Sequence, residues 1–270
     1  MVAAIACAGV ALACWLLSVA TREYSWVDRL WSIVPIGYAA GFAWASGLAP
    51  RPVLVASLVT AWGARLTFNF ARKGGYARGG EDYRWAELRR RMSPAAFQAF
   101  NVVFIAGLQN AILLAITLPA WRASTLEAPL GWLDAVATLV FLALLVGETT
   151  ADEQQWRFQT DKKARRARGE SIEHEFLTTG LFRYSRHPNF FCEQGMWWTL
   201  CLFPIAAGGA ALDPTFLGAL VLTALFHGSS NFTEELSLKK YPSYADYQRT
   251  TSRLIPWFPR PRPAASRGAP

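Results

Sequence analysis

The chain of 270 residues is 53% hydrophobic, contains 12 tryptophans and has only 17% charged residues, below the roughly 25% usual for a soluble domain. Its formal net charge of +8 is strongly basic. Four cysteines without a CxxC spacing and three scattered histidines indicate neither a disulfide framework nor a metal site. The composition therefore predicts an integral membrane protein and no bound metal.

Seven long apolar runs follow one another along the chain, and most reach the roughly 17–25 residues that a helix needs to cross a bilayer. They lie at residues 2–20, 31–48, 52–71, 97–120, 130–147, 190–211 and 214–232. The last two are separated by little more than Leu-Asp-Pro, which predicts a tight helical hairpin. The first could instead be a secretory signal, but it lacks a basic segment in front and further spans follow. The prediction is an all-α, polytopic membrane bundle of about seven transmembrane helices.

Lysines and arginines fall on alternate connections between these runs. Two lie in residues 22–29, seven in 72–91, eight in 157–186 and seven in 239–267, whereas the opposite side holds only Arg51 and Arg122. This split of 24 to two predicts a cytoplasmic C-terminus and an N-terminus outside. The charges could also serve only as topology signals and contacts to anionic lipids.

Domain organisation and location follow from the same pattern. Residues 1–258 are expected to form one transmembrane domain, and the Pro- and Arg-rich residues 259–270 a disordered tail. The location expected is a bacterial inner membrane or an ER-type membrane, with membrane lipids as partners. Nucleic acid is not an expected partner, because the basic residues are spread over loops. The oligomeric state is left open.

Polar side chains at the rims of the apolar runs are costly there, so each is a candidate for function. In chain order they are Asp28, Arg65 and Asn69 one helical turn apart, Glu148 and Asp152 at the exit of the fifth run, and Asn189, Glu193 and Trp197 on one face of the sixth. All lie toward the predicted cytoplasmic side. The buried carboxylate of Glu193 needs a partner, either a structural ion pair such as Arg65 or an amide of a ligand.

The sixth run is preceded by the polar segment LFRYSRHPN, residues 181–189. Pro188 suits the first turn of a helix, and a helix N-terminus favours anions. Arg183, Arg186 and His187 add charges and directional donors beside it. This segment predicts an anion-binding mouth at the membrane surface, although its basic side chains could simply reach lipid phosphates.

Two further segments have open interpretations. The glycine-rich loop 73–85 either folds over a bound phosphate or is a linker, and it lacks the strand–turn–helix setting of a dinucleotide fingerprint. Residues 234–259 combine lysines and arginines with Tyr241, Tyr244 and Tyr247. This combination suits stacking on a base and pairing with phosphate, and it equally suits an interfacial amphipathic helix.

The RHPN segment with Glu193, together with DRLWS (28–32), GEDYRWAELR (80–89) and KKYPSYADYQRTTSRLIPWFP (239–259), resembles the DUF1295 branch of the steroid 5-alpha-reductase-like integral membrane proteins. The resemblance covers nearly the whole chain. Sterol reductases and isoprenylcysteine carboxyl methyltransferases carry similar RHPN–Glu motifs. The resemblance implies a seven-helix enzyme that holds NADPH in a cytoplasmic-side cavity and reduces an enone of a steroid or isoprenoid-like lipid.

The resemblance also implies roles for single residues. Asn189 and Glu193 match positions that contact the nicotinamide side of the cofactor. Glu148 and Asp152 match an Asn–Asp pair that contacts the cofactor, and Glu148 departs from the family residue. By the same resemblance, Arg183, Arg186, Tyr247 and Arg253 would surround the phosphates and the adenosine of the cofactor. The other expected cofactor contacts are Arg65, Asn69, Tyr184 and His187.

The implied reaction is hydride transfer from NADPH to the β-carbon of the enone. Asp28 matches the acid that polarises the carbonyl oxygen, and an apolar setting would raise its pKa so that it can donate a hydrogen bond. The family tyrosine is replaced by Trp62, which leaves Tyr24 or Tyr83 as stand-ins.

Two rival functions remain at this stage. In an S-adenosylmethionine-dependent lipid or isoprenylcysteine-type methyltransferase, Glu193 would hold the methionine ammonium group, but the many basic residues in 157–186 and after 238 favour a cofactor with three phosphates. A transporter would need polar groups through the whole bilayer. Here they stop in the predicted cytoplasmic half, apart from Gln109, Asn110 and His227.

Overall fold

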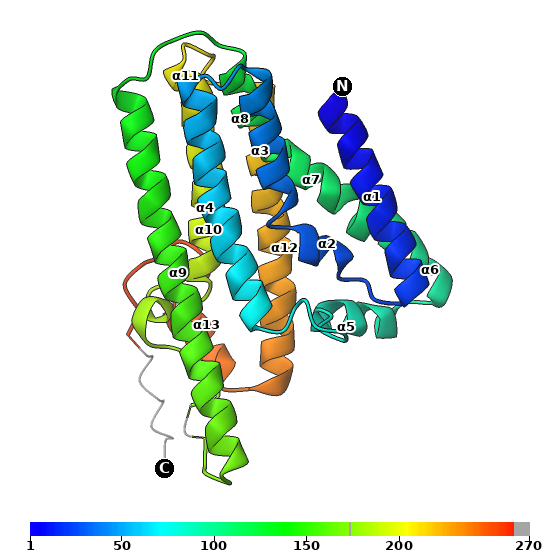
Figure 1. Cartoon of the computed structure of the whole chain (residues 1–270). Coiled ribbons are helices and arrows are strands. Elements are labelled where there is room, and N and C mark those ends of the chain that lie inside the picture. Colours follow the sequence, from blue (N-terminus) through cyan, green and yellow to red (C-terminus); the bar gives the residue numbers. More distant parts are fainter. Residues whose placement is uncertain (173, 262–270) are drawn as a thin grey trace. The chain divides into compact units, whose positions relative to one another are not determined.

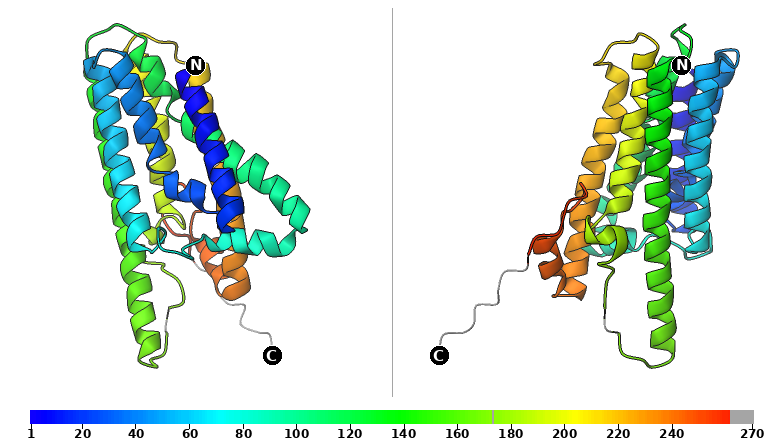
Figure 2. Two further views of the ribbon diagram at one scale, coloured as in Figure 1. Left: turned by 45° about the vertical axis from the view of Figure 1, so that its right-hand side comes forward. Right: turned by 90° about the vertical axis from the view of Figure 1, so that its left-hand side faces the viewer.

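A computed structural model describes residues 1–172 and 174–261, and every regular element in these two ranges is helical (Figures 1 and 2). The chain forms two compact units. Unit 1 comprises residues 1–141 and 197–222, and unit 2 comprises residues 142–196 and the chain from residue 223 onward. The helices α9 (Trp132–Ala167), α10 (Pro188–Leu200) and α12 (Leu217–Lys240) contribute residues to both units.

The remaining elements of unit 1 come mostly from the first half of the chain. They are α1 (Val2–Thr21), α2 (Trp26–Leu30), α3 (Val34–Ala45), α4 (Pro50–Arg72), α5 (Tyr83–Arg91), α6 (Pro94–Phe100), the π-helix η1 (Asn101–Leu108), α7 (Gln109–Ala115), α8 (Leu118–Ser124), α11 (Leu202–Ala206) and the 3-10 turn η3 (Pro214–Phe216). Unit 2 adds the 3-10 turn η2 (Gly180–Arg183) and α13 (Tyr244–Thr250).

Within residues 1–172 and 174–261, four helical segments are long and apolar enough to cross a membrane, as the composition predicted. They are Val2–Thr21, Pro50–Arg72, Pro94–Ser124 and Trp132–Ala167. Two of the other predicted spans are shorter or broken. The run 31–48 gives the 12-residue helix α3, and the run 190–211 divides at Cys201 into α10 and α11. The run 214–232 lies mainly in α12. The count of seven spans and the orientation of the termini therefore stay predictions.

The predicted hairpin between the last two runs is closed by a capped turn. Asp213 precedes η3 and accepts a hydrogen bond from the Thr215 backbone at 2.9 Å. It also pairs with Arg122 at 3.0 Å. The predicted tail at residues 259–270 falls mostly on residues 262–270, which lie outside the described residues.

A buried ion pair joins α4 to α9 within unit 1. Arg51 donates from Nε and Nη2 to the two carboxylate oxygens of Asp134, at 2.7 and 2.9 Å. Arg51 also donates to the carbonyl oxygens of Ala128 and Pro129. Both charged side chains are only 3% exposed. Since the partners lie 83 residues apart, sequence spacing gave no sign of this pair.

Aromatic rings form much of the core of unit 2. Phe176 contacts the rings of Tyr241, Tyr244 and Tyr247 with centroid distances of 6.0, 5.0 and 5.6 Å. The Tyr247 hydroxyl donates a hydrogen bond to the Phe182 carbonyl oxygen. Tyrosines that the sequence offered as ligand contacts are thus part of the packing that holds α13 against residues 176–182.

Candidate functional site

The RHPN segment of unit 2 lies at the start of α10, which begins at Pro188 as predicted. The C-terminal stretch, residues 252–257, runs beside it. The backbone amides of Arg186 and His187 donate to the carbonyl oxygens of Ser252 and Arg253, at 2.8 and 3.1 Å. The Trp257 amide donates to the Tyr184 carbonyl oxygen at 2.9 Å. These bonds fix residues 252–257 against residues 184–187.

Glu234 on α12 lies at the centre of this arrangement. Its carboxylate accepts hydrogen bonds from Arg186 Nε at 2.6 Å, Arg186 Nη2 at 3.0 Å, His187 Nε2 at 3.0 Å and Gln248 Nε2 at 2.8 Å. The residue is only 5% exposed. Burial opposes ionisation, but the bonds from His187, Arg186 and Gln248 outweigh it and lower the pKa of Glu234 to about 2. Glu234 is therefore a buried, ionised carboxylate at neutral pH.

Glu234 changes the interpretation of the RHPN segment. Arg186 uses its remaining Nη1 group to donate to the carbonyl oxygens of Gln248 and Thr251. The guanidinium thus holds α12, α13 and the C-terminal stretch together. The sequence predicted an anion at this position, and in the structure Glu234 supplies one. A direct contact of Arg186 or His187 with a cofactor stays a prediction.

Glu234 was not among the predicted site residues. An acidic residue near the end of a helix usually indicates an exposed surface charge. The neighbouring residue Glu235 is such a surface charge and pairs with Lys239 at 2.6 Å. The available signal was weak: two adjacent glutamates in a segment that is otherwise basic.

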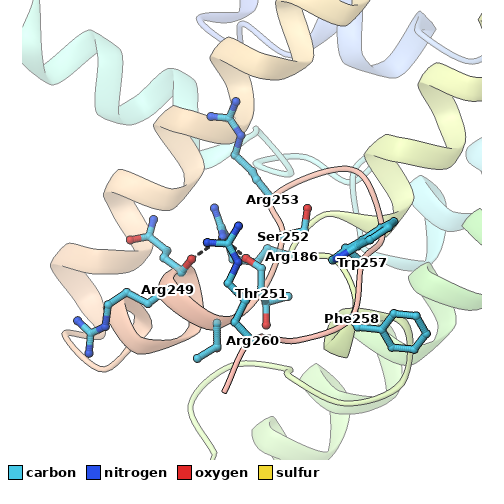
Figure 3. A pocket seen from close by; sticks show the side chains of 10 residues that line it. Arg186, Arg249, Thr251, Ser252, Arg253, Trp257, Phe258 and Arg260 are labelled. Atoms are coloured by element: carbon cyan, nitrogen blue, oxygen red, sulfur yellow. Dashed lines mark hydrogen bonds between the residues drawn. The ribbon is translucent and has the colours of Figure 1, made fainter. Parts of the chain in front are cut away.

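A basic pocket of about 240 Å³ lies next to this cluster (Figure 3). Arg253 bonds to the Asn231 side chain, and Arg249 bonds to Asp246. The Arg260 amide donates to the Thr250 carbonyl oxygen at 2.8 Å, so residues 250–260 form a loop whose two ends are hydrogen-bonded. The pocket is lined by Arg186, Gln248, Arg249, Thr250, Thr251, Ser252, Arg253, Trp257, Phe258 and Arg260. Of these, the sequence had singled out Arg186 and Arg253.

Other predicted cofactor residues of unit 2 lie deep on two closely packed helices. Glu148 and Asp152 on α9 are 2% and 6% exposed, and Glu193 on α10 is 7% exposed. The helices touch closely there, since a Cβ on Gly147 would lie 2.9 Å from the Cys192 sulfur atom. Buried carboxyl groups are costly unless they are paired, and the roles of these three residues as cofactor contacts stay predictions.

The predicted residues that flank α10 are more accessible. Asn189, in its first turn, is half-buried. Arg183 and Tyr184 are exposed, and the Arg183 guanidinium lies 6.0 Å from the centre of the Tyr184 ring. These side chains are available to a ligand or to the membrane surface.

Unit 1 contains the predicted acid, Asp28, on the short helix α2. The Trp85 indole nitrogen donates to Asp28 Oδ2 at 2.7 Å. Burial raises the pKa of Asp28, and the neighbouring carboxylate of Asp82 raises it further. The structure therefore agrees with the raised pKa that the sequence suggested. Tyr24 is only 6% exposed, whereas Tyr83 is 58% exposed, so the two stand-in tyrosines differ in environment.

The glycine-rich loop is held against residues 23–29, within unit 1. Arg29 Nε donates to the Gly75 carbonyl oxygen at 3.2 Å. The Glu23 side chain accepts from the Gly79 amide at 3.0 Å, and the Glu81 side chain accepts from the Tyr24 amide at 2.7 Å. These bonds give the loop a defined place against residues 23–29, and its two interpretations, a cover for a phosphate or a linker, both stay open.

The last predicted residues of unit 1 lie on α4. Asn69 is 5% exposed and accepts a hydrogen bond from Arg72 at 3.0 Å. Arg65 lies one turn before it. Trp62 is 1% exposed and packs edge to face on Trp197 with a centroid distance of 4.8 Å, so this departure from the family pattern is part of the core.

The predicted site residues thus divide between the units. Unit 1 contains Tyr24, Asp28, Arg65, Asn69 and Tyr83, and unit 2 contains Glu148, Asp152, Arg183, Tyr184, Arg186, His187, Asn189, Glu193, Tyr247 and Arg253. The structure joins Arg186, His187 and Arg253 through bonds to the same C-terminal stretch.

The described residues form an all-helical protein with helices long and apolar enough to cross a membrane. The sequence model of the family described as "Protein of unknown function (DUF1295)" matches residues 14–251. An uncharacterized protein of Schizosaccharomyces pombe is 37% identical over 258 residues, a match that covers 90% of this chain and 75% of that protein. No solved structure gives a significant match. The chain therefore belongs to the DUF1295 family, whose context is the steroid 5-alpha-reductase-like superfamily.

Proposed function

We propose that the protein is a membrane reductase that uses NADPH to reduce the conjugated double bond of an enone in a steroid or isoprenoid-like lipid. The observation that carries this proposal is the basic pocket of unit 2. Three arginines other than Arg186 line it, together with the hydroxyl groups of residues 250–252. Arginine recognises phosphate in a bidentate manner, so this donor set suits a phosphorylated ligand.

The size of the pocket indicates which part of the cofactor would occupy it. A pocket of about 240 Å³ is smaller than the roughly 300–1,000 Å³ of sites that enclose a whole ligand. It suits one end of a dinucleotide, and the end that carries the 2′-phosphate is the more anionic one. Arg249, Arg253 and Arg260 would hold that end.

The side chains of the two units would have different tasks. NADPH supplies a hydride when it is bound. Glu234 fixes Arg186 and, through it, the stretch that carries Arg253. Asp28, whose pKa is raised by burial, would in its protonated form donate a hydrogen bond to the carbonyl oxygen as negative charge develops there. Trp85, bonded to Asp28 Oδ2, orients the carboxyl group for this task.

A ligand-binding experiment tests the proposal. The full chain is purified in detergent and titrated by calorimetry with NADPH, NADH and S-adenosylmethionine. We expect NADPH to bind most tightly. Replacing Arg253 or Arg260 by glutamine should weaken NADPH binding roughly tenfold or more, since a hydrogen bond to a charged group contributes about 1.5–3 kcal/mol.

A matched control separates the pocket from general charge. Arg165 on α9 is exposed and paired only with Asp161, four residues earlier on the same helix, so Arg165→Gln removes one positive charge outside the pocket and should leave NADPH affinity unchanged. Binding of S-adenosylmethionine alone would refute the reductase and favour a methyltransferase. An equal effect of Arg165→Gln and Arg253→Gln would show that the pocket is not the binding site.

A further inference from the structure

An exposed apolar surface lies on the C-terminal stretch of unit 2, at the rim of the basic pocket that Trp257 and Phe258 help to line. Ile255, Trp257 and Phe258 are 67%, 70% and 76% exposed, and Tyr184 beside them is 37% exposed. Phe258 and Tyr184 meet edge to face with a centroid distance of 6.1 Å. We call these four residues the aromatic patch.

The backbone of the aromatic patch is held in place although its side chains are exposed. The Trp257 amide donates to the Tyr184 carbonyl oxygen at 2.9 Å, and the Arg260 amide donates to the Thr250 carbonyl oxygen at 2.8 Å. The Ser185 hydroxyl donates to the Leu254 carbonyl oxygen at 2.7 Å. The backbone of the stretch is thus fixed at three points, and its large apolar side chains are exposed in the folded unit. Contiguous exposed apolar surface of this kind marks an interaction site.

The charges around the aromatic patch indicate what it contacts. Arg183, Arg249 and Arg260 are exposed. Arg183 directly precedes Tyr184, and Arg249 and Arg260 lie on either side of residues 250–259 in the sequence. In Figure 3, Trp257 and Phe258 extend to the right of the pocket, away from Arg249. Aromatic side chains accompanied by arginines are typical of the interface between a bilayer and water, and anionic lipids attract basic residues by about 1 kcal/mol each. In the part of the chain that the structure describes, four helices are long and apolar enough to cross a bilayer.

We propose that the aromatic patch lies in the headgroup region of an anionic leaflet, where Ile255, Trp257 and Phe258 insert and Arg183 contacts a lipid phosphate. The stretch is then a surface anchor that fixes unit 2 at the membrane. Only Arg183 is assigned to lipid, because Arg249 and Arg260 line the pocket proposed for NADPH. Failure of the anchor would leave the NADPH proposal standing, because the test below measures exposure to lipid and not cofactor binding.

Site-directed spin labelling of the full chain tests the anchor. Cys14, Cys192 and Cys201 are buried and only Cys7 is partly exposed, so Phe258→Cys in a Cys7→Ser background gives one accessible thiol. The protein is reconstituted in vesicles of phosphatidylcholine and phosphatidylglycerol. Collisions of the label with oxygen, which concentrates in lipid, are compared with collisions with a water-soluble nickel chelate.

Two positions on α9 calibrate the measurement. Leu139, 67% exposed within an apolar helix, serves as the lipid reference, and the exposed Lys163 serves as the water reference. We expect the oxygen-to-nickel ratio at position 258 to be several-fold above that of Lys163→Cys. Removing phosphatidylglycerol should lower this ratio toward the water reference. Ile255→Cys gives a second labelling position if Phe258→Cys does not fold.

Three results would overturn the proposal. A ratio at positions 255 and 258 equal to that at Lys163→Cys would place the patch in water. A label shielded from both reagents would place it against protein, and dipolar broadening between labels would identify that protein as a second copy of this chain. A ratio that does not respond to phosphatidylglycerol would refute the role of anionic lipid.

Discussion

Replacing Glu234 by glutamine should destabilise unit 2 strongly. The change keeps the shape of the side chain but removes its charge and one acceptor. Arg186, whose side chain is only 9% exposed, then keeps a buried positive charge without a counter-charge. His187 and Gln248 lose a charged acceptor at the same time.

The magnitude follows from the contacts of the carboxylate. A pKa of about 2, compared with the ordinary 4.5, corresponds to about 3 kcal/mol of stability at neutral pH. Removal of one partner from a buried ion pair costs about 3–5 kcal/mol, and the amide of glutamine recovers part of this by accepting one bond. We therefore expect a loss of about 2–4 kcal/mol and a decrease in Tm of about 5–10 °C.

The assay is thermal unfolding of the full chain in detergent with a thiol-reactive dye. Cys192 is buried in the same unit and becomes reactive when that unit opens. Glu235→Gln is the matched control, because Glu235 is the next residue on α12 and its exposed pair with Lys239 contributes at most about 1 kcal/mol. Equal Tm values for the two variants would refute the role assigned to Glu234.

Three further predictions concern stability. Because the folded-state pKa of Glu234 is below its ordinary value, its contribution to stability should be complete above about pH 4.5 and lost as the pH falls toward 2. Acid titrations followed by tryptophan fluorescence should therefore show a smaller loss of stability for Glu234→Gln than for the wild type. Arg51→Gln should cost about 3–5 kcal/mol, because it leaves the buried Asp134 carboxylate without its positive partner. Arg122→Gln should cost at most about 1 kcal/mol, because the Arg122 side chain is 33% exposed. Similar Tm values for these two variants would contradict the burial argument. Gly218→Ala should destabilise the protein by about 1–3 kcal/mol, because the new Cβ would lie 2.2 Å from the Ala115 backbone. Gly228→Ala in the same helix should be neutral or stabilising, because its Cβ would meet nothing within 4 Å. If thermal unfolding in detergent ranks the two variants the other way, the packing described here is refuted.

The sequence predicted the membrane helices best where an apolar run is long and unbroken. Residues 2–20 and 52–71 correspond closely to α1 and α4. Hydropathy could not show that the run 190–211 breaks at Cys201, because the break changes backbone geometry and not polarity. The run 31–48 likewise contains Ser46, which ends α3 although the residues around it stay apolar.

Candidate site residues could be predicted where unusual side chains stand together in one segment of the sequence. Asp28 and the RHPN segment stand out because polar groups border an apolar run. Glu234 could not be found in this way, since its partners Arg186 and His187 lie 48 and 47 residues away. Tyr247 was expected to contact the cofactor because it lies in a basic, aromatic segment. Its ring packs against Phe176, and a contact with the cofactor stays a prediction. Long-range pairing of this kind leaves no local pattern.

The central claim is that the basic pocket of unit 2 binds the phosphorylated adenosine end of NADPH. Calorimetric titration of the full chain with adenosine 2′,5′-bisphosphate tests it most directly, because this fragment contains that end and lacks the nicotinamide. The account predicts that the fragment binds, competes with NADPH and loses roughly tenfold or more in affinity in Arg253→Gln. Absence of binding, or binding that Arg253→Gln does not change, would contradict it.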